Sequence, residues 1–448
     1  MLHERKPYDV VIVGGGASGT ALLYALTKYT NINRIALLEK YAELGQVNSK
    51  STNNSQTLHV GDIETNYSLE KATEVKPAAN MLVHYVDRLK NKKEKEEIMQ
   101  KIQKMILAVG KEEVEKLEKR YEDFKELYPY LEKLDREGIS KVEPAVVDGR
   151  SSREPVLGLF TTEGYGVDYG RLAKSFVDES TKSKKKEIEP ILNCEVKNII
   201  KDGRGYRLVT SRGPIRAKVV VVDADSYSLH FAKKLGYGEE YSLIPIAGSF
   251  YFSEQILKGK VYTMQEPKLP FAAVHGDPDV NVAGATRWGP TARAFPVLES
   301  GKLATSKDYF ISAGLLKIDT WKSFFKILFD KVRLPYLAKN VLYEIPGIGT
   351  KLFVKNVQKI VPSMKASDLR IAKGFGGMRL QRVDIRTQEL QLGEGKIVGD
   401  NILFNMTPSP GASVCLYNAW RDSKQVVEFL GGDAKFEAEK MKKDFSDN

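Results

Sequence analysis

Three glycines after a short apolar run restrict the fold of this chain more than any other feature. Gly14, Gly16 and Gly19 form the pattern G-x-G-x-x-G directly after the segment 9–13, and a helix-periodic stretch follows at 17–29. In this pattern the first glycine makes a tight turn, the second lets the backbone approach a pyrophosphate, and the third lets the helix pack closely on the strand. The segment therefore predicts strand, turn and helix, the start of a doubly wound α/β unit.

A carboxylate at the end of the next predicted strand extends this motif. The strand is expected at 34–39, and Glu39 stands twenty residues after Gly19. An acidic side chain at that place can accept hydrogen bonds from both ribose hydroxyls of an adenine dinucleotide. The start of the preceding helix offers unpaired N–H groups and a partial positive charge to the phosphates. A dinucleotide site is predicted here, and these residues alone leave FAD and NAD open.

The rest of the chain alternates between helical and strand-like patterns. Residues 78–134 predict a solvated helical hairpin, and strands are predicted within 191–225 and at 243–252, 261–262 and 280–285. Residues 317–342 predict a helix, and 402–406 with 413–430 a last strand and helix. We expect an α/β fold in which a doubly wound, Rossmann-like domain is interleaved with an α+β substrate domain built on an antiparallel sheet. The expected division assigns 1–75, 161–240 and 371–448 to the nucleotide domain, 76–160 to a helical and substrate-domain segment, and 241–370 to the substrate domain.

Charge and composition narrow the class of protein and its partners. The formal net charge is +11, which suits an anionic membrane surface, anionic small molecules or simply a lysine-rich solvated surface. No zinc finger, RNA-binding signature or continuous basic helix accompanies the charge, so no nucleic-acid partner is expected. No stretch is apolar and long enough to predict a transmembrane helix, and the polar start of the chain predicts no signal peptide. The two cysteines and five histidines show neither a disulfide framework nor metal-ligand spacing, so no metal is expected.

Five further segments carry a family resemblance. The first contains Asn54 and Ser55, followed by His59 and Gly61, and the others are 271–278, 287–291, 377–381 and 405–413. In this order they resemble the malate:quinone oxidoreductase family, FAD-dependent enzymes of the D-amino-acid-oxidase superfamily. The order of the motifs is specific, although each motif alone is not. The resemblance runs from about residue 8 to residue 430.

The resemblance implies FAD as the cofactor and a 2-hydroxy acid as the substrate. It implies oxidation of (S)-malate to oxaloacetate by hydride transfer from C2 to flavin N5, with the electrons passed to a membrane quinone. One alternative is another FAD-dependent dehydrogenase or oxidase acting on lactate or 2-hydroxyglutarate. A less favoured alternative is a flavin-containing binding protein whose basic surface holds RNA.

The glycine pattern and the resemblance together assign the residues that bind FAD. The turn at 408–413 is expected to begin a second helix, whose N–H groups can meet the pyrimidine edge of the flavin, where negative charge accumulates on reduction. The assigned residues are Gly14, Gly15, Gly16, Ala17, Ser18, Gly19, Glu39, Lys40, Asn54, Ser55, Gln56, Val196, Ala224, Gly411, Ala412 and Ser413.

One segment departs from the family pattern. Asp223, Ala224 and Asp225 stand where such enzymes usually carry a small Asn-Ala-Gly turn beside the cofactor. Asp225 in place of glycine adds a carboxylate and a Cβ atom. The sequence leaves two adjustments open: a different backbone at this point, or a nearby basic group that compensates the charge.

The chemistry requires a base for the hydroxyl proton and cations for the substrate carboxylates. Histidine suits the first task because its pKa lies near working pH, and the resemblance places His59 and His275 near the substrate. His275, beside Asp277, is the better candidate for the base, and His59 for contact with FAD. Arg379 is the expected carboxylate anchor because a guanidinium matches a carboxylate in two-pronged geometry. Gln381 is expected to face the same side, and Arg287 and Arg382 are weaker candidates for the second carboxylate.

Residues 317–339 combine aromatic and basic side chains at helical spacing. Trp321, Phe324 and Phe325 recur with lysines between them, as in a basic amphipathic helix that lies in a membrane interface. On these residues alone, a core-facing helix with solvated lysines fits the pattern slightly better. With the resemblance to a quinone-linked family, we expect a peripheral protein on the cytoplasmic face of the inner membrane.

Overall fold

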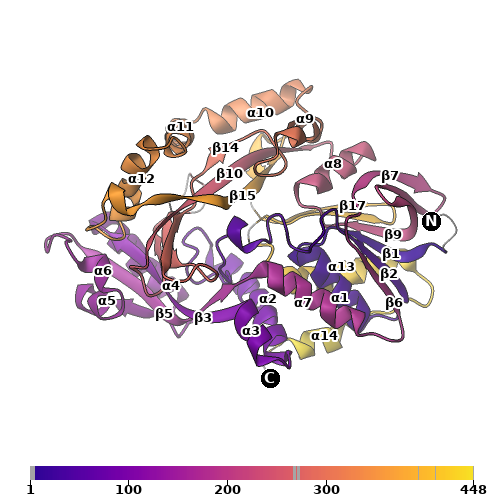
Figure 1. Ribbon diagram of the computed structural model, residues 1–448, viewed down its shortest axis with the longest axis horizontal. Coiled ribbons are helices and arrows are strands. Elements are labelled where there is room, and N and C mark those ends of the chain that lie inside the picture. Colours follow the sequence, from indigo (N-terminus) through magenta and orange to yellow (C-terminus); the bar gives the residue numbers. More distant parts are fainter. Residues whose placement is uncertain (1–5, 266–268, 270–272, 392, 409, 447–448) are drawn as a thin grey trace.

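The computed structural model describes residues 6–265, 269, 273–391, 393–408 and 410–446. Its strands form two sheets that lie side by side in Figure 1. The first sheet contains β1 (Tyr8–Val13), β2 (Arg34–Leu38), β6 (Glu187–Ile191), β7 (Val196–Asp202), β8 (Gly205–Thr210), β9 (Gly213–Val222), β17 (Gly395–Gly399) and β18 (Ile402–Met406).

The centre of the first sheet is parallel. Its order is β17-β18-β9-β1-β2-β6, with the hairpin β7-β8 attached to β9. β18, β9, β1, β2 and β6 are mutually parallel neighbours, whereas β17 is antiparallel to β18. Runs of valine and isoleucine in β1 and β9 are buried on both faces, as expected for parallel strands covered by helices. On one face α1 (Ala17–Tyr29), α7 (Tyr169–Thr181) and α13 (Cys415–Leu430) form a common core with these strands.

The second sheet is almost entirely antiparallel. Its order is β16 (Glu389–Gln391), β15 (Arg370–Asp384), β10 (Tyr241–Glu254), β13 (Ala285–Gly289), β12 (His275–Pro278), β11 (Lys260–Thr263), β3 (Met99–Val109), β5 (Val156–Val167) and β4 (Glu132–Leu134), with β14 (Arg293–Ala294) beside β10. Only the pairing of β11 with β3 is parallel among these neighbours. The last stretch of the chain therefore contributes β15 and β16 to this sheet and β17 and β18 to the other.

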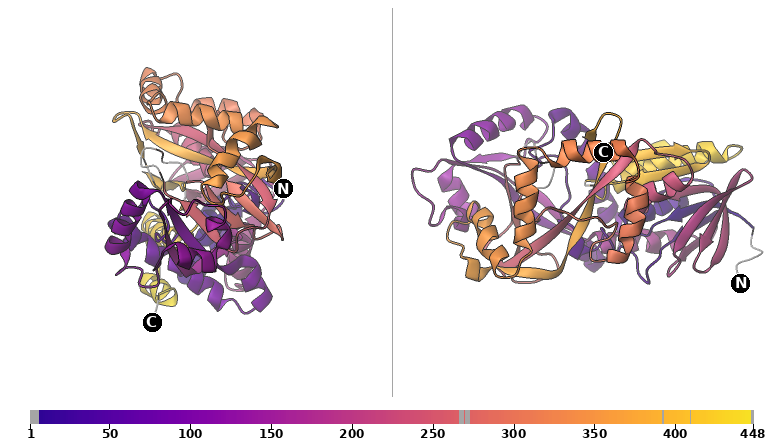
Figure 2. Two further views of the ribbon diagram at one scale, coloured as in Figure 1. Left: turned by 90° about the vertical axis from the view of Figure 1, so that its left-hand side faces the viewer. Right: turned by 90° about the horizontal axis from the view of Figure 1, so that it is seen from above.

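Helices cover the second sheet along one side of the molecule. These are α9 (Ser306–Ala313), α10 (Ile318–Leu328), α11 (Arg333–Tyr343) and α12 (Ile348–Gln358), which lie along the upper edge in Figure 1 and in front in the right view of Figure 2. The remaining helices are α2 (Leu69–Arg88), α3 (Lys92–Ile98), α4 (Lys111–Phe124), α5 (Arg136–Val142), α6 (Pro144–Val147), α8 (Ser226–Lys234) and α14 (Ala438–Asp444). Within the described ranges, no helix has the length and apolar character needed to span a bilayer.

The fold class predicted from the sequence is confirmed, but three local predictions are wrong. Residues 99–109 form β3 within the expected helical hairpin, because their partners β5 and β11 lie far along the chain. The strand expected up to residue 285 instead begins there, as β13. The helix expected at 317–342 is two helices. Asp330 accepts hydrogen bonds from the amides of Val332 and Arg333 at the start of α11, and Pro335 fits the first turn of that helix, where an N–H has no helical partner.

Candidate functional site

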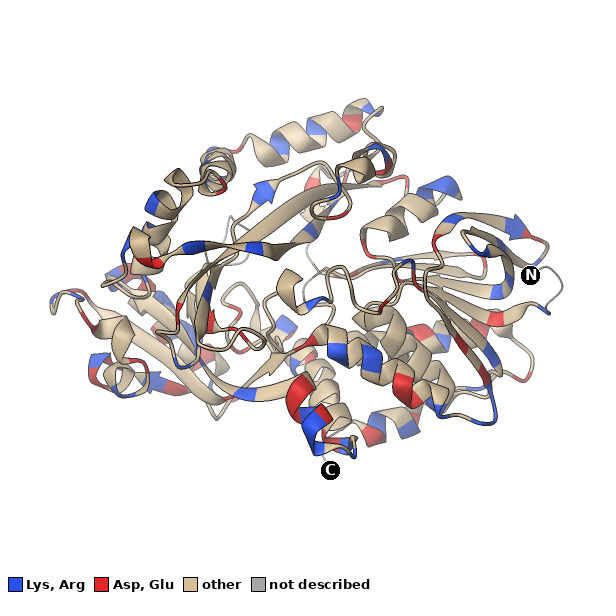
Figure 3. Cartoon of the chain, viewed as in Figure 1, with Lys and Arg blue, Asp and Glu red and all other residues tan. Residues whose placement is uncertain are grey.

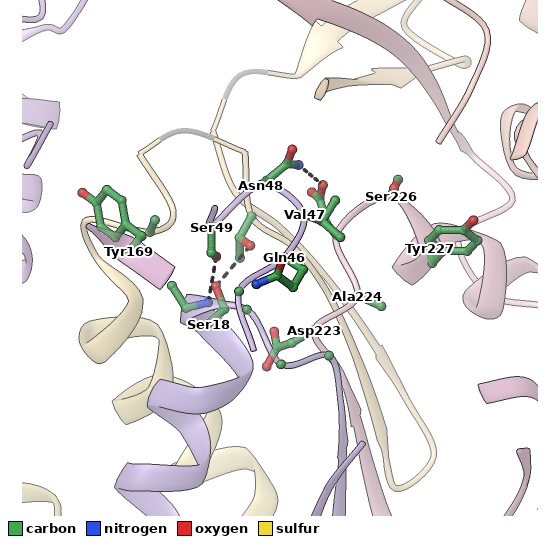
Figure 4. Close-up of a pocket in the computed structure, with 18 of the residues that line it drawn as sticks. Ser18, Gln46, Val47, Asn48, Ser49, Tyr169, Asp223, Ala224, Ser226 and Tyr227 are labelled. Atoms are coloured by element: carbon green, nitrogen blue, oxygen red, sulfur yellow. Dashed lines mark hydrogen bonds between the residues drawn. The ribbon is translucent and has the colours of Figure 1, made fainter. Parts of the chain in front are cut away.

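A pocket opens at the carboxyl ends of β1, β2 and β9 and also receives residues of β15 from the second sheet (Figure 4). This edge of a doubly wound sheet is where ligands bind. Of the residues predicted to bind FAD, those that line the pocket are Gly14, Gly15, Gly16, Ala17, Ser18, Glu39, Lys40, Asn54, Ser55, Val196, Ala224, Ala412 and Ser413. His59 and Arg379 line it as well.

The glycine turn is built for close approach. Gly14 has φ +121°, and a Cβ atom there would lie 2.3 Å from the carbonyl oxygen of Asp223. A Cβ atom on Gly19 would lie 2.1 Å from the carbonyl oxygen of Gly14, so both positions require glycine. Gly16, the N-cap residue of α1, supplies no side-chain cap, and no acidic residue lies in the first turn of the helix. The amide of Ala17 donates to Ser49 Oγ at 2.9 Å, and the helix start suits a diphosphate.

The end of β2 carries a carboxylate held by backbone amides. Glu39 accepts hydrogen bonds from the amide of Gly15 at 2.8 Å and from the amide of Tyr41 at 2.9 Å. Burial raises the pKa of Glu39 despite these amides. The next residue, Lys40, pairs with Glu299 and lies 4.5 Å from the ring centre of Tyr227. Sequence reasoning missed Glu299, which comes from a loop far along the chain.

His59 enters the pocket with its ring fixed on both sides. Its Nδ1 lies 2.5 Å from Glu64 Oε1, and its Nε2 lies 3.2 Å from Ser55 Oγ. Burial acts to raise the pKa of Glu64, but the nearby His59 and Lys104 outweigh it, so that pKa lies below its ordinary value. Because Nδ1 is taken by a carboxylate, Nε2 is the nitrogen that remains for proton exchange, and its present partner, Ser55, also lines the pocket. Sequence reasoning missed Glu64, although it stands only five residues beyond His59.

Arg379 on β15 lines the pocket without a charged partner. Among the residues that the structure describes, none forms a hydrogen bond or an ion pair with its guanidinium. Burial lowers the pKa of Arg379, and the groups close enough to act on its charge are Tyr262, Tyr67 and Tyr336. A desolvated guanidinium with no carboxylate partner can accept the carboxylate of a ligand.

The structure places His275 outside the pocket. Its side chain is fully buried, it stacks on Tyr262 with ring centres 4.4 Å apart, and burial lowers its pKa to about 3. Its Nε2 lies 3.4 Å from Asp277 Oδ1 but is not aligned for a hydrogen bond. Asp277 instead pairs with Lys260 and with Arg287, each at 3.1 Å.

Other predicted residues also lie behind the pocket wall. Arg287 belongs to the buried ion cluster around Asp277, and Gln381 is buried on β15 opposite Ile244. Gln56 holds its own loop by donating to the carbonyl of Ser51 and accepting from the amide of Val280. Gly411 occupies a turn in which a Cβ atom would lie 2.5 Å from the carbonyl oxygen of Thr407. The motif residues Phe271, Ala272 and Ser409 lie outside the described residues.

At 223–225, where Asp225 stands in place of the usual glycine, no described basic side chain pairs with the added carboxylate. Asp225 has φ +50°, a conformation that favours glycine, so the backbone keeps the turn that a glycine would adopt. Asn48 donates a hydrogen bond to Asp225 Oδ2, and within the described ranges no lysine or arginine pairs with this carboxylate. Arg382 lies beside Asp225 in a small second cavity but stacks on Tyr241.

Comparison with known proteins adds a family match. Residues 6–418 match the family model described as malate:quinone oxidoreductase. The chain is 43% identical over 453 residues to the malate:quinone oxidoreductase of Helicobacter pylori (strain ATCC 700392 / 26695), with 98% of each chain covered. It is 44% identical over 449 residues to a protein named "Probable malate:quinone oxidoreductase" of Campylobacter jejuni, covering 97% of this chain and 99% of that protein. The fold is similar to that of L-alpha-glycerophosphate oxidase from Mycoplasma pneumoniae, with a TM-score of 0.66, 19% identity and coverage of 96% and 97%.

Proposed function

The chain belongs to the malate:quinone oxidoreductase family, and from this membership we propose the roles of its pocket residues. It is an FAD-dependent oxidoreductase that oxidises malate and passes the electrons to a quinone. The observation that supports a specific mechanism is the meeting of His59 and Arg379, from different parts of the fold, in one pocket with the glycine turn.

The residues around the pocket fit FAD. The glycine turn at 14–16 and the open N-terminus of α1 would receive the diphosphate, and Glu39 the adenosine ribose. Ala412 and Ser413 would lie at the flavin edge, as the family resemblance suggests. When bound, FAD supplies the acceptor, flavin N5, for the hydride from C2 of malate.

Arg379 binds one carboxylate of the hydroxy acid in this mechanism. Its guanidinium is desolvated and lacks a charged partner among the described residues, so an incoming carboxylate gains a charge-assisted contact in a site of low dielectric. Tyr67, Tyr262 and Tyr336 are close enough to act on the charge of the guanidinium. The substrate would thereby be held in the pocket by one of its carboxylates.

His59 accepts the hydroxyl proton. Its Nε2 has no carboxylate partner and would take the proton, while Glu64 would hold the proton on Nδ1 and stabilise the imidazolium that forms. His275 is less suited to this task than we expected from the sequence, because burial lowers its pKa to about 3 and it does not line the pocket. We assign His275 and Arg287 to the buried cluster that supports the pocket wall.

Anaerobic titration of the purified yellow protein tests this function. L-Malate is expected to bleach the flavin absorbance, and a soluble quinone analogue is expected to restore it, without any requirement for NAD. L-Lactate and L-2-hydroxyglutarate serve as parallel titrants. Bleaching by L-2-hydroxyglutarate but not by L-malate would replace the proposed substrate, and a protein that takes up no FAD would end the proposal.

We also propose that α9 to α12 bring the enzyme to the membrane that holds its quinone. All but three of the exposed large apolar side chains in the described part of the chain fall between residues 303 and 348. One exposed apolar stripe runs along α10 to the residue just after it: Ile318, Trp321, Phe325 and Phe329. Phe324 and Ile327 of the same helix face the core. An outward apolar stripe on a helix that already packs a core is typical of an interfacial surface.

The charge of these helices complements an anionic leaflet. Residues 302–355 contain ten basic and four acidic side chains, a net charge of +6 out of the +11 of the whole chain, and the blue bands along α10 to α12 in Figure 3 mark several of them.

Helix α11 also connects this face with the pocket. Leu334 and Val341 are exposed, while Tyr336 on the opposite side of the helix is within electrostatic range of Arg379. This arrangement favours peripheral binding, which in the cell would be to the cytoplasmic face of the inner membrane.

Sedimentation with lipid vesicles tests the membrane contact. The enzyme is expected to bind vesicles with anionic headgroups at low salt, to bind neutral vesicles more weakly, and to lose binding in a Trp321→Asp/Phe325→Asp variant. Lys119→Glu on α4, which is exposed on another helix, is the control for a change of charge alone. Unchanged sedimentation of the double variant would remove this surface from consideration.

A further inference from the structure

The pocket holds more carboxylates than cations, although its cofactor is an anion. Its acidic lining residues are Glu39, Glu195, Asp223, Asp225 and Glu299, and its basic ones are Lys40 and Arg379. Glu39 is held by two backbone amides, and Glu299 pairs with Lys40. Glu195 is exposed to solvent. No lysine or arginine in the described part of the chain forms an ion pair with the two remaining pocket carboxyl groups, Asp223 and Asp225.

Asp223 lies against the glycine turn. Its amide donates to the carbonyl of Val13 at 2.8 Å, and its own carbonyl is the atom that excludes a side chain at Gly14. Asn405 Nδ2 donates to Asp223 Oδ1 at 2.9 Å and also to Asp422 Oδ2 at 2.6 Å. Asp223 Oδ2 is buried and has no hydrogen-bond partner among the described residues. Figure 4 shows Asp223 near the residues of this turn.

The groups around Asp223 favour its neutral form. From α13 Asp422 faces it, from β17 Lys396 pairs with Asp422 rather than with Asp223, and Glu394 adds a further negative charge. Burial and Asp422 together raise the pKa of Asp223 to about 7. The only neutral donor that reaches it among the described side chains is Asn405.

Asp225 is in a similar position on the other side of Ala224. Asn48 donates to it from the 45–49 loop, Ser226 follows it at the start of α8, and Glu299 contributes repulsion. Arg382 of β15 lies beside it across a small cavity but stacks on Tyr241. Burial raises the pKa of Asp225 to about 6.

We propose that Asp223 and Asp225 bind FAD as neutral carboxylic acids, so that binding of the cofactor takes up protons from solvent. This inference rests on the proposed FAD site. An ionised carboxylate in this pocket would add negative charge close to an anionic cofactor, and no described lysine or arginine pairs with either residue. A protonated carboxyl removes that repulsion and supplies an O–H donor. A neutral Asp223 also has the shape and donor capacity of the asparagine that related enzymes usually carry at this place.

The sign of the pH dependence follows from linkage. Binding of an anionic cofactor raises the pKa of each carboxyl above its pKa in the cofactor-free protein. The affinity for FAD is therefore fully present at pH values below the pKa of the cofactor-free protein. It is lost as the pH rises from that pKa toward the pKa of the FAD-bound protein. The free values of about 6 for Asp225 and about 7 for Asp223 place this loss in the neutral to mildly alkaline range. Each proton taken up makes the Kd for FAD rise roughly tenfold per pH unit there.

The experiment measures FAD affinity at fixed ionic strength from about pH 5.5 to about pH 8.5. The holoenzyme is stripped and titrated with FAD, whose fluorescence is quenched on binding. The Kd of the wild type is expected to be flat below about pH 6 and to rise steeply above about pH 7. D223N and D225N are each expected to flatten this rise, and the double variant to remove most of it. Asp400→Asn, an exposed carboxylate paired with Lys201, is the matched control and keeps the wild-type slope.

A second readout applies to the intact holoenzyme. Infrared spectroscopy at about pH 7.5 is expected to show the C=O stretch of a protonated carboxyl that is missing from D223N/D225N. A pH-independent Kd in the wild type, a double variant with the wild-type slope, or the absence of that band would each overturn the inference. A chain that takes up no FAD at any pH would instead refute the FAD site itself. Thermal melting of each variant separates loss of affinity from loss of fold.

Discussion

Replacing Arg379 by methionine is expected to damage substrate binding while leaving the fold intact. Arg379 is half-buried, has no ionic partner among the described residues, and lies within electrostatic range of three tyrosines. Losing a buried contact between a guanidinium and a substrate carboxylate costs about 3 kcal/mol, which corresponds to roughly a 150-fold fall in kcat/KM. The carboxylate is bound in the ground state as well as in the transition state, so most of the effect is expected in KM.

The same substitution is expected to have the opposite effect on stability. A half-buried cation without an ionic partner costs free energy in the substrate-free protein, and an apolar residue of similar length removes that cost. The midpoint of thermal unfolding of R379M without malate is therefore expected to equal or exceed that of the wild type. Added malate should raise the midpoint of the wild type but not that of the variant.

The assay combines steady-state kinetics with thermal melting, and the matched control is Arg370→Met. Arg370 lies on the same strand β15 but is exposed, so its loss should leave KM unchanged. If R379M melts at a clearly lower temperature and keeps the wild-type KM for malate, Arg379 is a structural residue. It then does not bind the substrate carboxylate.

Three further predictions concern the base, the turn and the buried cluster. His59→Asn should slow malate-dependent flavin reduction by roughly 10²- to 10⁴-fold in stopped-flow measurements while the protein stays yellow, whereas His275→Asn should change thermal stability more than the reduction rate. Gly14→Ala should abolish FAD retention on purification, because its Cβ atom would lie 2.3 Å from a backbone oxygen at φ +121°; a yellow variant would contradict this. Lys260→Met should lower stability by about 3 kcal/mol in chemical unfolding, because Asp277 loses a buried partner, with exposed Lys258→Met as the comparison.

The N-terminal unit could be predicted because its signals are local. The strand, turn and helix from residue 8 to residue 29 require only neighbours in sequence, and the second strand ends at the place its apolar run predicts. β3 could not be predicted in the same way. Its apolar half, 105–109, is short enough to fit a helix, and only the distant β5 and β11 determine that it is a strand. Tertiary pairing decides such ambiguous segments.

The local sequence was also insufficient to rank the two histidines as candidates for the base. Both stand in family-like motifs, and His275 has the nearer carboxylate in sequence, at Asp277. We propose the opposite order, because Tyr262 stacks on His275 outside the pocket, while His59 lines the pocket and contacts Glu64. Burial depends on contacts across the second sheet, which the sequence around each histidine does not contain.

The loop that carries His59 contacts both the second sheet, at β15, and the start of α13, which packs on the first sheet. On one side, the backbone carbonyl of Asn53 approaches so closely that a Cβ atom on Gly377 would lie 2.0 Å from it, two residues before Arg379. On the other side, Ser413 Oγ accepts from the His59 amide at 3.0 Å at the start of α13. The loop is thus held by the strand that carries the carboxylate anchor and by the helix expected at the flavin edge. Because the loop of the proposed base packs directly against the strand of the proposed anchor, we expect the packing of the two sheets to set the separation of the two side chains.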